Sequence, residues 1–286
     1  MRSPILHYPD QSPAKTPWRM LADCESLRGS FPFRIGTSSY IIPADILPNV
    51  HALAPVVDDI ELVVFESADI SNIPTPAVAD ELGRLRSLHA MSYTLHLPLD
   101  IELGHSDESY RRHSVVRCLQ IIDRLKPASP FANVLHFSHP SFPQPLPTAD
   151  IPRWLTALSR SVDELLAAGV PSQSLCIETL SYPFELVGEI VESRDLAVCL
   201  DIGHLLLKSY DVAAHFDRYW PRTRIVHLHG IREGRDHRDI IDLESDLLAM
   251  VISHLCDNSR ERVLTLELFN EEDLALSLYK LKEFLP

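Results

Sequence analysis

The stretch LCIETLSYPFELVGEIVESRDLAVCLDIGH, residues 175–204, contains the repeating unit of this chain. Two short runs, residues 175–179 and 197–200, are mostly apolar, which is typical of strands buried on both faces. Between them, residues 183–193 space their apolar side chains as a helix does. A strand, a helix and a second strand in this order form a parallel βαβ unit. The two strands end at the acidic residues Glu178 and Asp201.

The same alternation runs through the chain from residue 31 onwards. We expect strands at residues 33–37, 60–65, 92–97, 133–137, 175–179, 197–200, 224–228 and 263–268, and helices at 44–54, 75–88, 107–125, 152–168, 183–193, 212–219, 242–255 and 271–284. Seven strand-to-strand repeats lie between residue 37 at the end of the first strand and residue 267 on the eighth, so one repeat takes about 33 residues. Eight such units predict an α/β fold, the (β/α)8 TIM barrel. A doubly wound open sheet is the alternative, but it usually needs a Gly-rich first turn, and the nine glycines form no GxGxxG.

The amino-acid composition does not change along the chain after residue 31, and no linker divides this part of the chain into two domains. Of the 286 residues, 45% are hydrophobic and 23% charged, which allows one large core. We therefore expect a short N-terminal arm over residues 1–30 and a single barrel domain over residues 31–286. The arm carries four prolines and no apolar segment of the kind found in secretory signals. No stretch approaches the roughly 18 apolar residues that cross a bilayer.

The net charge indicates which kind of partner the protein binds, and the cysteines indicate in which cellular compartment it works. The 26 basic and 40 acidic side chains give a formal net charge of −14, which disfavours a nucleic-acid partner and leaves a small-molecule substrate as the expectation. The five cysteines are widely spaced, odd in number and without a CxxC pair. Cys118, Cys176 and Cys199 lie in apolar runs, so we expect buried thiols and a reducing, cytoplasmic location.

Histidines and carboxylates follow the predicted strands at one end of the barrel, where TIM-barrel active sites lie. The third to eighth strands contribute, in order, His96, His136, Glu178, Asp201 with His204, His227 with His229, and Glu267. A single strand-end histidine is more often a hydrogen-bonded core residue than a ligand. This many carboxylates and imidazoles in one barrel mouth, however, would repel one another or lack solvation without a compensating cation. The series therefore predicts a site for Zn²⁺, Mn²⁺ or Fe²⁺.

The pattern resembles the xylose isomerase-like barrel superfamily, which includes endonuclease IV (AP endonuclease family 2) and many sugar epimerases. The most specific part of the match is Asp201-x-x-His204, followed by His227 and Glu267. Within the superfamily, four segments look like the CbiR family of cobamide-remodelling phosphodiesterases: GTSSYIIPADILPNV (36–50), DDIELVVFES (58–67), YTLHLPLDIELG (93–104) and HLHGIREGRDHRD (227–239).

The endonuclease-like branch implies up to three metal positions. His96, His136 and Glu178 match the ligands of the first ion. The second set is Glu178, Asp201, His227 and Glu267, with Glu178 bridging the two ions. His204, with Asp236 and His237, matches a third set, but the endonuclease loop reads Asp-x-His where this chain has the adjacent pair Asp236-His237. We therefore expect two ions, and a third only if the altered spacing still brings these residues together.

Other residues near the predicted site are candidates for supporting roles. Glu66 and Asp239 could hold the second nitrogen of a histidine ligand, a role that carboxylates often fill. The loop after the seventh strand carries Arg232, Arg235 and Arg238, which could clamp phosphate oxygens or simply form a solvated charged loop. His229 and Tyr40 are further candidates for contact with substrate.

Three functions fit these residues, and fold alone does not choose among them. The resemblance favours a metal-dependent phosphodiesterase that hydrolyses the nucleotide loop of a cobamide, releasing a cobinamide phosphate and the lower-ligand riboside. A sugar or sugar-phosphate isomerase or epimerase is the alternative. It needs only the single-metal set, with Glu178 and Glu267 as acid and base, and does not require His96 and His136. An AP endonuclease is disfavoured by the acidic charge, and a non-catalytic binding protein would be expected to lose ligands.

Overall fold

In the computed structural model, which describes residues 26–66, 71–139, 141, 147–257 and 260–285, eight parallel strands close into a barrel. Around the barrel the strands follow the order β1-β10-β7-β6-β5-β4-β3-β2. Their bounds are β1 Arg34–Ser38, β2 Asp59–Val63, β3 Ser92–His96, β4 Asn133–Leu135, β5 Leu175–Glu178, β6 Ala197–Asp201, β7 Thr223–Leu228 and β10 Val263–Leu266. The predicted TIM barrel is confirmed, and the open sheet is excluded because β1 pairs with both β2 and β10.

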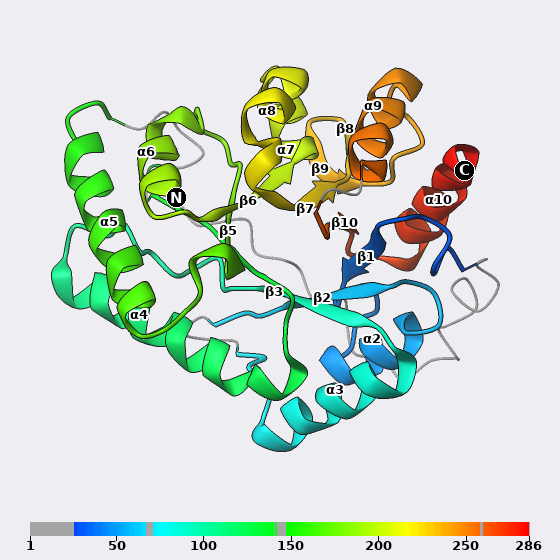
Figure 1. Ribbon diagram of the computed structural model, residues 1–286, viewed down its shortest axis with the longest axis horizontal. Helices are drawn as coiled ribbons and strands as arrows, with labels where there is room; N and C mark the ends of the chain where they lie inside the picture. Colours follow the sequence, from blue (N-terminus) through cyan, green and yellow to red (C-terminus); the bar gives the residue numbers. More distant parts are fainter. Residues whose placement is uncertain (1–25, 67–70, 140, 142–146, 258–259, 286) are drawn as a thin grey trace.

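The helices form an outer layer around the strands (Figure 1). They are α2 Ile46–Leu53, α3 Pro76–His89, α4 Glu108–Arg124, α5 Ile151–Ala167, α6 Glu185–Ser193, α7 Ile202–Leu207, α8 Val212–Tyr219, α9 Ser245–Cys256 and α10 Glu271–Leu281, with short 3₁₀ turns at Lys126–Ala128, Ser172–Ser174, Trp220–Arg222 and Lys282–Phe284. Side-chain caps fix several starts: Thr75 caps α3, Asp107 caps α4 and Asn270 caps α10. None of the described helices is long and apolar enough to cross a membrane.

Two elements near the barrel mouth were not among the predicted ones. Helix α7 begins directly after β6, where the Asp201 side chain accepts a hydrogen bond from the His204 backbone N–H (2.7 Å). The hairpin of β8 (Gly230–Arg232) and β9 (Arg235–Arg238) turns at Glu233 and Gly234, which both have positive φ (54° and 72°), as a type I′ turn requires. The hairpin lacks the apolar alternation by which strands are recognised, since most of its side chains are charged.

The barrel interior is mostly apolar, but buried polar side chains lie at both ends. Asp59 accepts hydrogen bonds from Ser92 and Thr94 near the amino ends of β2 and β3, and the candidate ligands lie at the mouth. Cys118, Cys176 and Cys199 are buried free thiols, as predicted. The first described residues, which the sequence places in the arm, pack on the barrel: Leu27 is buried in the core, and Arg28 donates to the Ala54 carbonyl (2.8 Å). The rest of the predicted arm, residues 1–25, lies outside the described part of the chain.

Candidate metal centre

The predicted ligands lie together at the carboxyl ends of the strands because parallel strands end at the same rim. His96, Glu178 and Asp201 are the last residues of β3, β5 and β6. Asp201 lies opposite His227 of β7 in the sheet register. His136 and Glu267 directly follow β4 and β10. Apart from the half-buried His136, these side chains are buried.

Glu178 joins the first group, which consists of His96, His136 and Glu178. The Glu178 Oε2 atom lies 2.9 Å from His136 Nε2 and 3.3 Å from His96 Nε2. The other ring nitrogen of His96, Nδ1, lies 2.9 Å from the Leu97 carbonyl oxygen. This contact places a proton on Nδ1 and leaves the Nε2 lone pair directed at the carboxylate. Two electron-rich atoms face each other, so the pair needs a proton or a cation between them.

The second group consists of Glu178, Asp201, His227 and Glu267, with potential ligand atoms all within 4.8 Å of one another. The His227 Nδ1 atom lies 3.2 Å from Glu267 Oε2 and 3.7 Å from Asp201 Oδ2. Because Glu178 belongs to both groups, its carboxylate is the only part of the described site that could bridge ions held in the two groups.

The donor set fits divalent cations. Among the described residues, four buried atoms at this point have no hydrogen-bond partner: His96 Nε2, Glu178 Oε1, His227 Nδ1 and Glu267 Oε2. Buried polar atoms without partners destabilise a fold, and native proteins rarely leave several together. Burial alone would raise the pKa of Glu178, but His136 and the neighbouring imidazoles outweigh it and hold that pKa well below its usual value. The buried His/Glu/Asp clusters are thus suited to divalent metal ions, as the sequence predicts.

Glu61 is a site residue that was not predicted from the sequence. Its Oε2 atom lies 2.9 Å from His227 Nε2, and both side chains are fully buried. A carboxylate in this position fixes the proton on Nε2 and turns Nδ1 toward Asp201 and Glu267. The available signal was the acidic pair at alternate positions in the buried strand DIELV, since Asp59 and Glu61 face the same side of β2.

The two carboxylates predicted for that role bind arginines instead. Glu66 forms an ion pair with Arg117. Asp239 accepts from Arg232 (2.8 Å) and from the backbone N–H of Ile241 (3.1 Å). The guanidinium of Arg232 also lies 3.4 Å from Asp242, so it is neutralised by acidic neighbours and is a poor candidate for a phosphate clamp.

The remaining candidates around the hairpin differ in their surroundings. Arg238 lies 3.9 Å from Asp273, whereas Arg235 is exposed and no described carboxylate forms an ion pair with it. Tyr40 follows β1 and makes edge contacts with Phe65 and Phe269. Among the described arginines of the hairpin, Arg235 is therefore the one whose positive charge is least neutralised by carboxylates.

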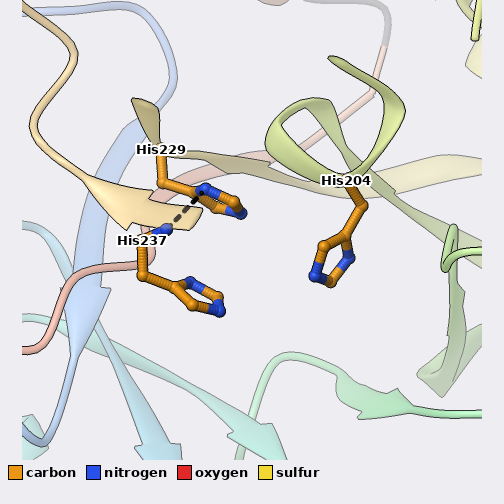
Figure 2. A group of neighbouring side chains, drawn as sticks. All are labelled: His204, His229 and His237. Carbon is orange, nitrogen blue, oxygen red and sulfur yellow. Dashed lines mark hydrogen bonds between the residues drawn. The ribbon is translucent and has the colours of Figure 1, made fainter. Parts of the chain in front are cut away.

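A third group lies beside the first two and comprises His204, His229 and His237 (Figure 2). His204 comes from α7, His229 follows β7, and His237 belongs to the hairpin. Asp236 Oδ2 lies 4.0 Å from the Nε2 atoms of both His204 and His237. The altered spacing of Asp236 and His237 therefore still brings both residues to His204.

A cavity of about 660 Å³ opens beside the candidate ligands. Its walls include the candidate ligands His136, His204 and Asp236, together with Tyr110 and Lys208. Lys208 is half-buried, and within the described chain it forms no ion pair with a carboxylate. It was not predicted from the sequence, because a lysine after the α7 segment has no motif to mark it.

A closed (β/α)8 barrel with buried histidines and carboxylates at its carboxyl rim defines a class of metal-binding barrel enzymes. Within that class, this chain belongs to the xylose isomerase-like TIM barrel family, whose model matches residues 57–283. No curated protein has a significantly similar sequence.

Solved structures share the fold at low sequence identity. A D-tagatose 3-epimerase-like protein superposes with a TM-score of 0.72 at 20% identity, covering 88% of this chain and 97% of the other. D-psicose 3-epimerase from Clostridium cellulolyticum gives 0.67 at 13%, with 88% and 99% covered. Endonuclease IV from Thermus thermophilus gives 0.62 at 20%, with 87% and 99% covered. These similarities support the fold and leave the reaction open.

We predict that Glu61→Ala lowers the affinity for Zn²⁺ by about 10- to 100-fold, because His227 loses the group that orients it while every candidate ligand remains. Glu61→Gln keeps an acceptor oxygen and should lose less. Competition titration with a chelator measures both affinities. Wild-type affinity in the alanine variant would show that Glu61 does not orient His227 for metal binding.

Proposed function

We propose that this chain is a metal-dependent phosphodiesterase that hydrolyses a P–O bond in the nucleotide loop of a cobamide. The observation that carries the proposal is the shared carboxylate of Glu178, which contacts His96 and His136 on one side and belongs to the four-residue group on the other. A carboxylate shared by two ligand groups would suit a pair of neighbouring ions, which phosphodiester hydrolysis commonly uses.

Each group of residues has a distinct task in this proposal. His96 and His136 would hold one ion with Glu178, while Asp201, His227 and Glu267 would complete the other set. Such ions supply an activated water and neutralise charge on the phosphoryl group and its leaving oxygen. Burial raises the pKa of Glu267, but His227 and His237 outweigh it and lower the pKa to about 2, so Glu267 stays anionic at neutral pH. The anionic carboxylate is the form of glutamate that binds a metal ion.

The choice of a cobamide rests on the resemblance of four segments to cobamide-remodelling phosphodiesterases. The cavity beside the ligands supports a substrate of some size, since its volume of about 660 Å³ is in the range of pockets for drug-sized ligands, roughly 300–1,000 Å³. Lys208 in its wall provides a positive charge for a phosphodiester. The net charge of −14 disfavours a nucleic-acid duplex as the substrate, although endonuclease IV shares the fold.

Sugar isomerisation or epimerisation is the second candidate, and the comparisons with solved structures favour it over hydrolysis. The structures named above include a D-tagatose 3-epimerase-like protein and a D-psicose 3-epimerase. The group of Glu178, Asp201, His227 and Glu267 would suffice for one ion, with the two glutamates as acid and base on opposite faces of a sugar. This reaction gives no task to His96 and His136, and that is why we place it second.

We predict that the His96→Ala/His136→Ala double variant separates the two reactions. Cleavage of cobalamin in its nucleotide loop should fall by about 100-fold or more, because one ion loses two ligands. The double variant of the exposed residues His51 and His113, each to Ala, is the matched control and should retain activity. Chromatography of corrinoid products and of ketohexose mixtures measures both reactions. Cobalamin left intact by the wild type, together with ketohexose epimerisation undiminished in His96→Ala/His136→Ala, would favour the second candidate.

We also predict that Lys208→Ala and Arg235→Ala each raise the KM for a phosphodiester substrate by about 10- to 100-fold, or roughly 1.5–3 kcal/mol for a charge-assisted bond. Metal content should not change, since neither side chain is a ligand. Steady-state kinetics with elemental analysis tests this, and Lys208→Arg, which keeps the charge, is the control. Wild-type KM in both alanine variants would mean that neither cation binds the phosphate.

A further inference from the structure

We propose that His229 is a positioning residue and not a metal ligand: one ring nitrogen holds the carboxylate of Asp201, and the other holds the β8–β9 hairpin at His237. The inference rests on the metal-binding part of the proposed function and is independent of the substrate. It concerns a residue that lies among potential ligands but uses its nitrogens differently from its neighbours.

The first observation is that His229 Nδ1 accepts a hydrogen bond. The backbone N–H of His237 donates to this atom at 3.0 Å, the contact drawn as a dashed line in Figure 2. The carbonyl oxygen of Gly230 lies farther from the same nitrogen, at 3.4 Å. The shorter contact, in which Nδ1 accepts from an N–H, therefore favours the tautomer with the proton on Nε2. The lone pair of Nδ1 is therefore occupied.

The second observation is where that Nε2 proton points. His229 Nε2 lies 3.2 Å from Asp201 Oδ1 and 3.3 Å from Oδ2, so the ring donates to this carboxylate. Asp201 Oδ1 also accepts from the backbone N–H of His204 at 2.7 Å. Asp201 is thus held by two donors. With both nitrogens engaged, His229 has no lone pair left for an ion.

The two neighbouring histidines make the contrast clear. His204 Nδ1 lies 3.2 Å from the carbonyl oxygen of Thr179, and His237 Nδ1 lies 3.2 Å from that of Glu267. In each ring the backbone contact can hold the proton on Nδ1, which leaves Nε2 available. Both Nε2 atoms lie 4.0 Å from Asp236 Oδ2. His204, Asp236 and His237 therefore have the free atoms of a ligand set, and His229 does not.

The local backbone is adapted to this position of the ring. A Cβ at Gly203 would lie only 2.0 Å from Cε1 of His229, so the residue directly before His204 must lack a side chain for the fully buried ring to fit. On the hairpin side, His237 has a positive φ of 54°, which is uncommon for a residue other than glycine and costs conformational energy. That conformation presents its N–H to His229.

Two substitutions separate the two tasks. His229→Gln places an amide N–H near the position of Nε2 but removes the acceptor at Nδ1. His229→Asn keeps an acceptor near Nδ1 and cannot reach Asp201. Neither side chain is larger than histidine, so neither overpacks the site. The measurements are Zn²⁺ content and affinity, by elemental analysis and chelator competition, and hydrogen exchange of the peptide that contains residues 235–238.

We expect His229→Gln to keep the wild-type Zn²⁺ content and to exchange the His237 amide hydrogen at least about 10-fold faster. His229→Asn should protect that amide and bind Zn²⁺ about 10-fold more weakly. Loss of one equivalent of Zn²⁺ in both variants would make His229 a ligand and overturn the inference. Wild-type affinity and exchange in both would overturn it too. A wild-type protein that binds no Zn²⁺ would instead contradict the proposed function, while the exchange measurement would still test the contact with the hairpin.

Discussion

The carboxylate of Glu178 is buried among four imidazoles, and the arrangement of the barrel mouth depends on it. His136, His204 and His96 lie within 3.3 Å of its oxygens, and His227 lies 3.8 Å away. A buried anion is tolerable only with compensating positive charge. Burial lowers the pKa of His96 and His227, but the neighbouring anionic groups outweigh it and raise both pKa values, so protonated imidazoles could supply that charge. A proton on the inward nitrogen, however, competes with its use as a metal ligand. Divalent cations resolve this conflict for every group at once.

The fold and the main ligand set could be predicted from the sequence because both follow from simple periodicities. Apolar runs at regular spacing locate the strands, and parallel strands must end at one rim. His96, Glu178, Asp201 and Glu267 could therefore be brought together without knowing any contact distance. Even the changed spacing of Asp236 and His237 leaves both residues near His204, because the hairpin turns back over the mouth of the barrel.

The supporting residues could not be predicted, because their roles depend on which atoms meet across the barrel. Glu61 lies far from His227 in the sequence, yet the closed sheet brings their side chains to 2.9 Å. Arg232 has the sequence context of a phosphate clamp, but the hairpin turns it onto Asp239. His229 has the residue type of a ligand, and only its two hydrogen bonds reveal a different task. The spacing of the strands predicts that a residue lies at the rim of the barrel, but it does not predict which atoms its side chain contacts.

The Glu178 carboxylate belongs to two groups of potential ligands, and we propose that it serves two metal positions. Elemental analysis of Zn²⁺-loaded wild type and Glu178→Gln, after removal of loosely bound ions, tests this double role. We expect at least two equivalents per chain in the wild type and the loss of tight binding at both positions in the variant, because each group loses its shared oxygen ligand. A wild type that holds one equivalent, retained in Glu178→Gln, would contradict it.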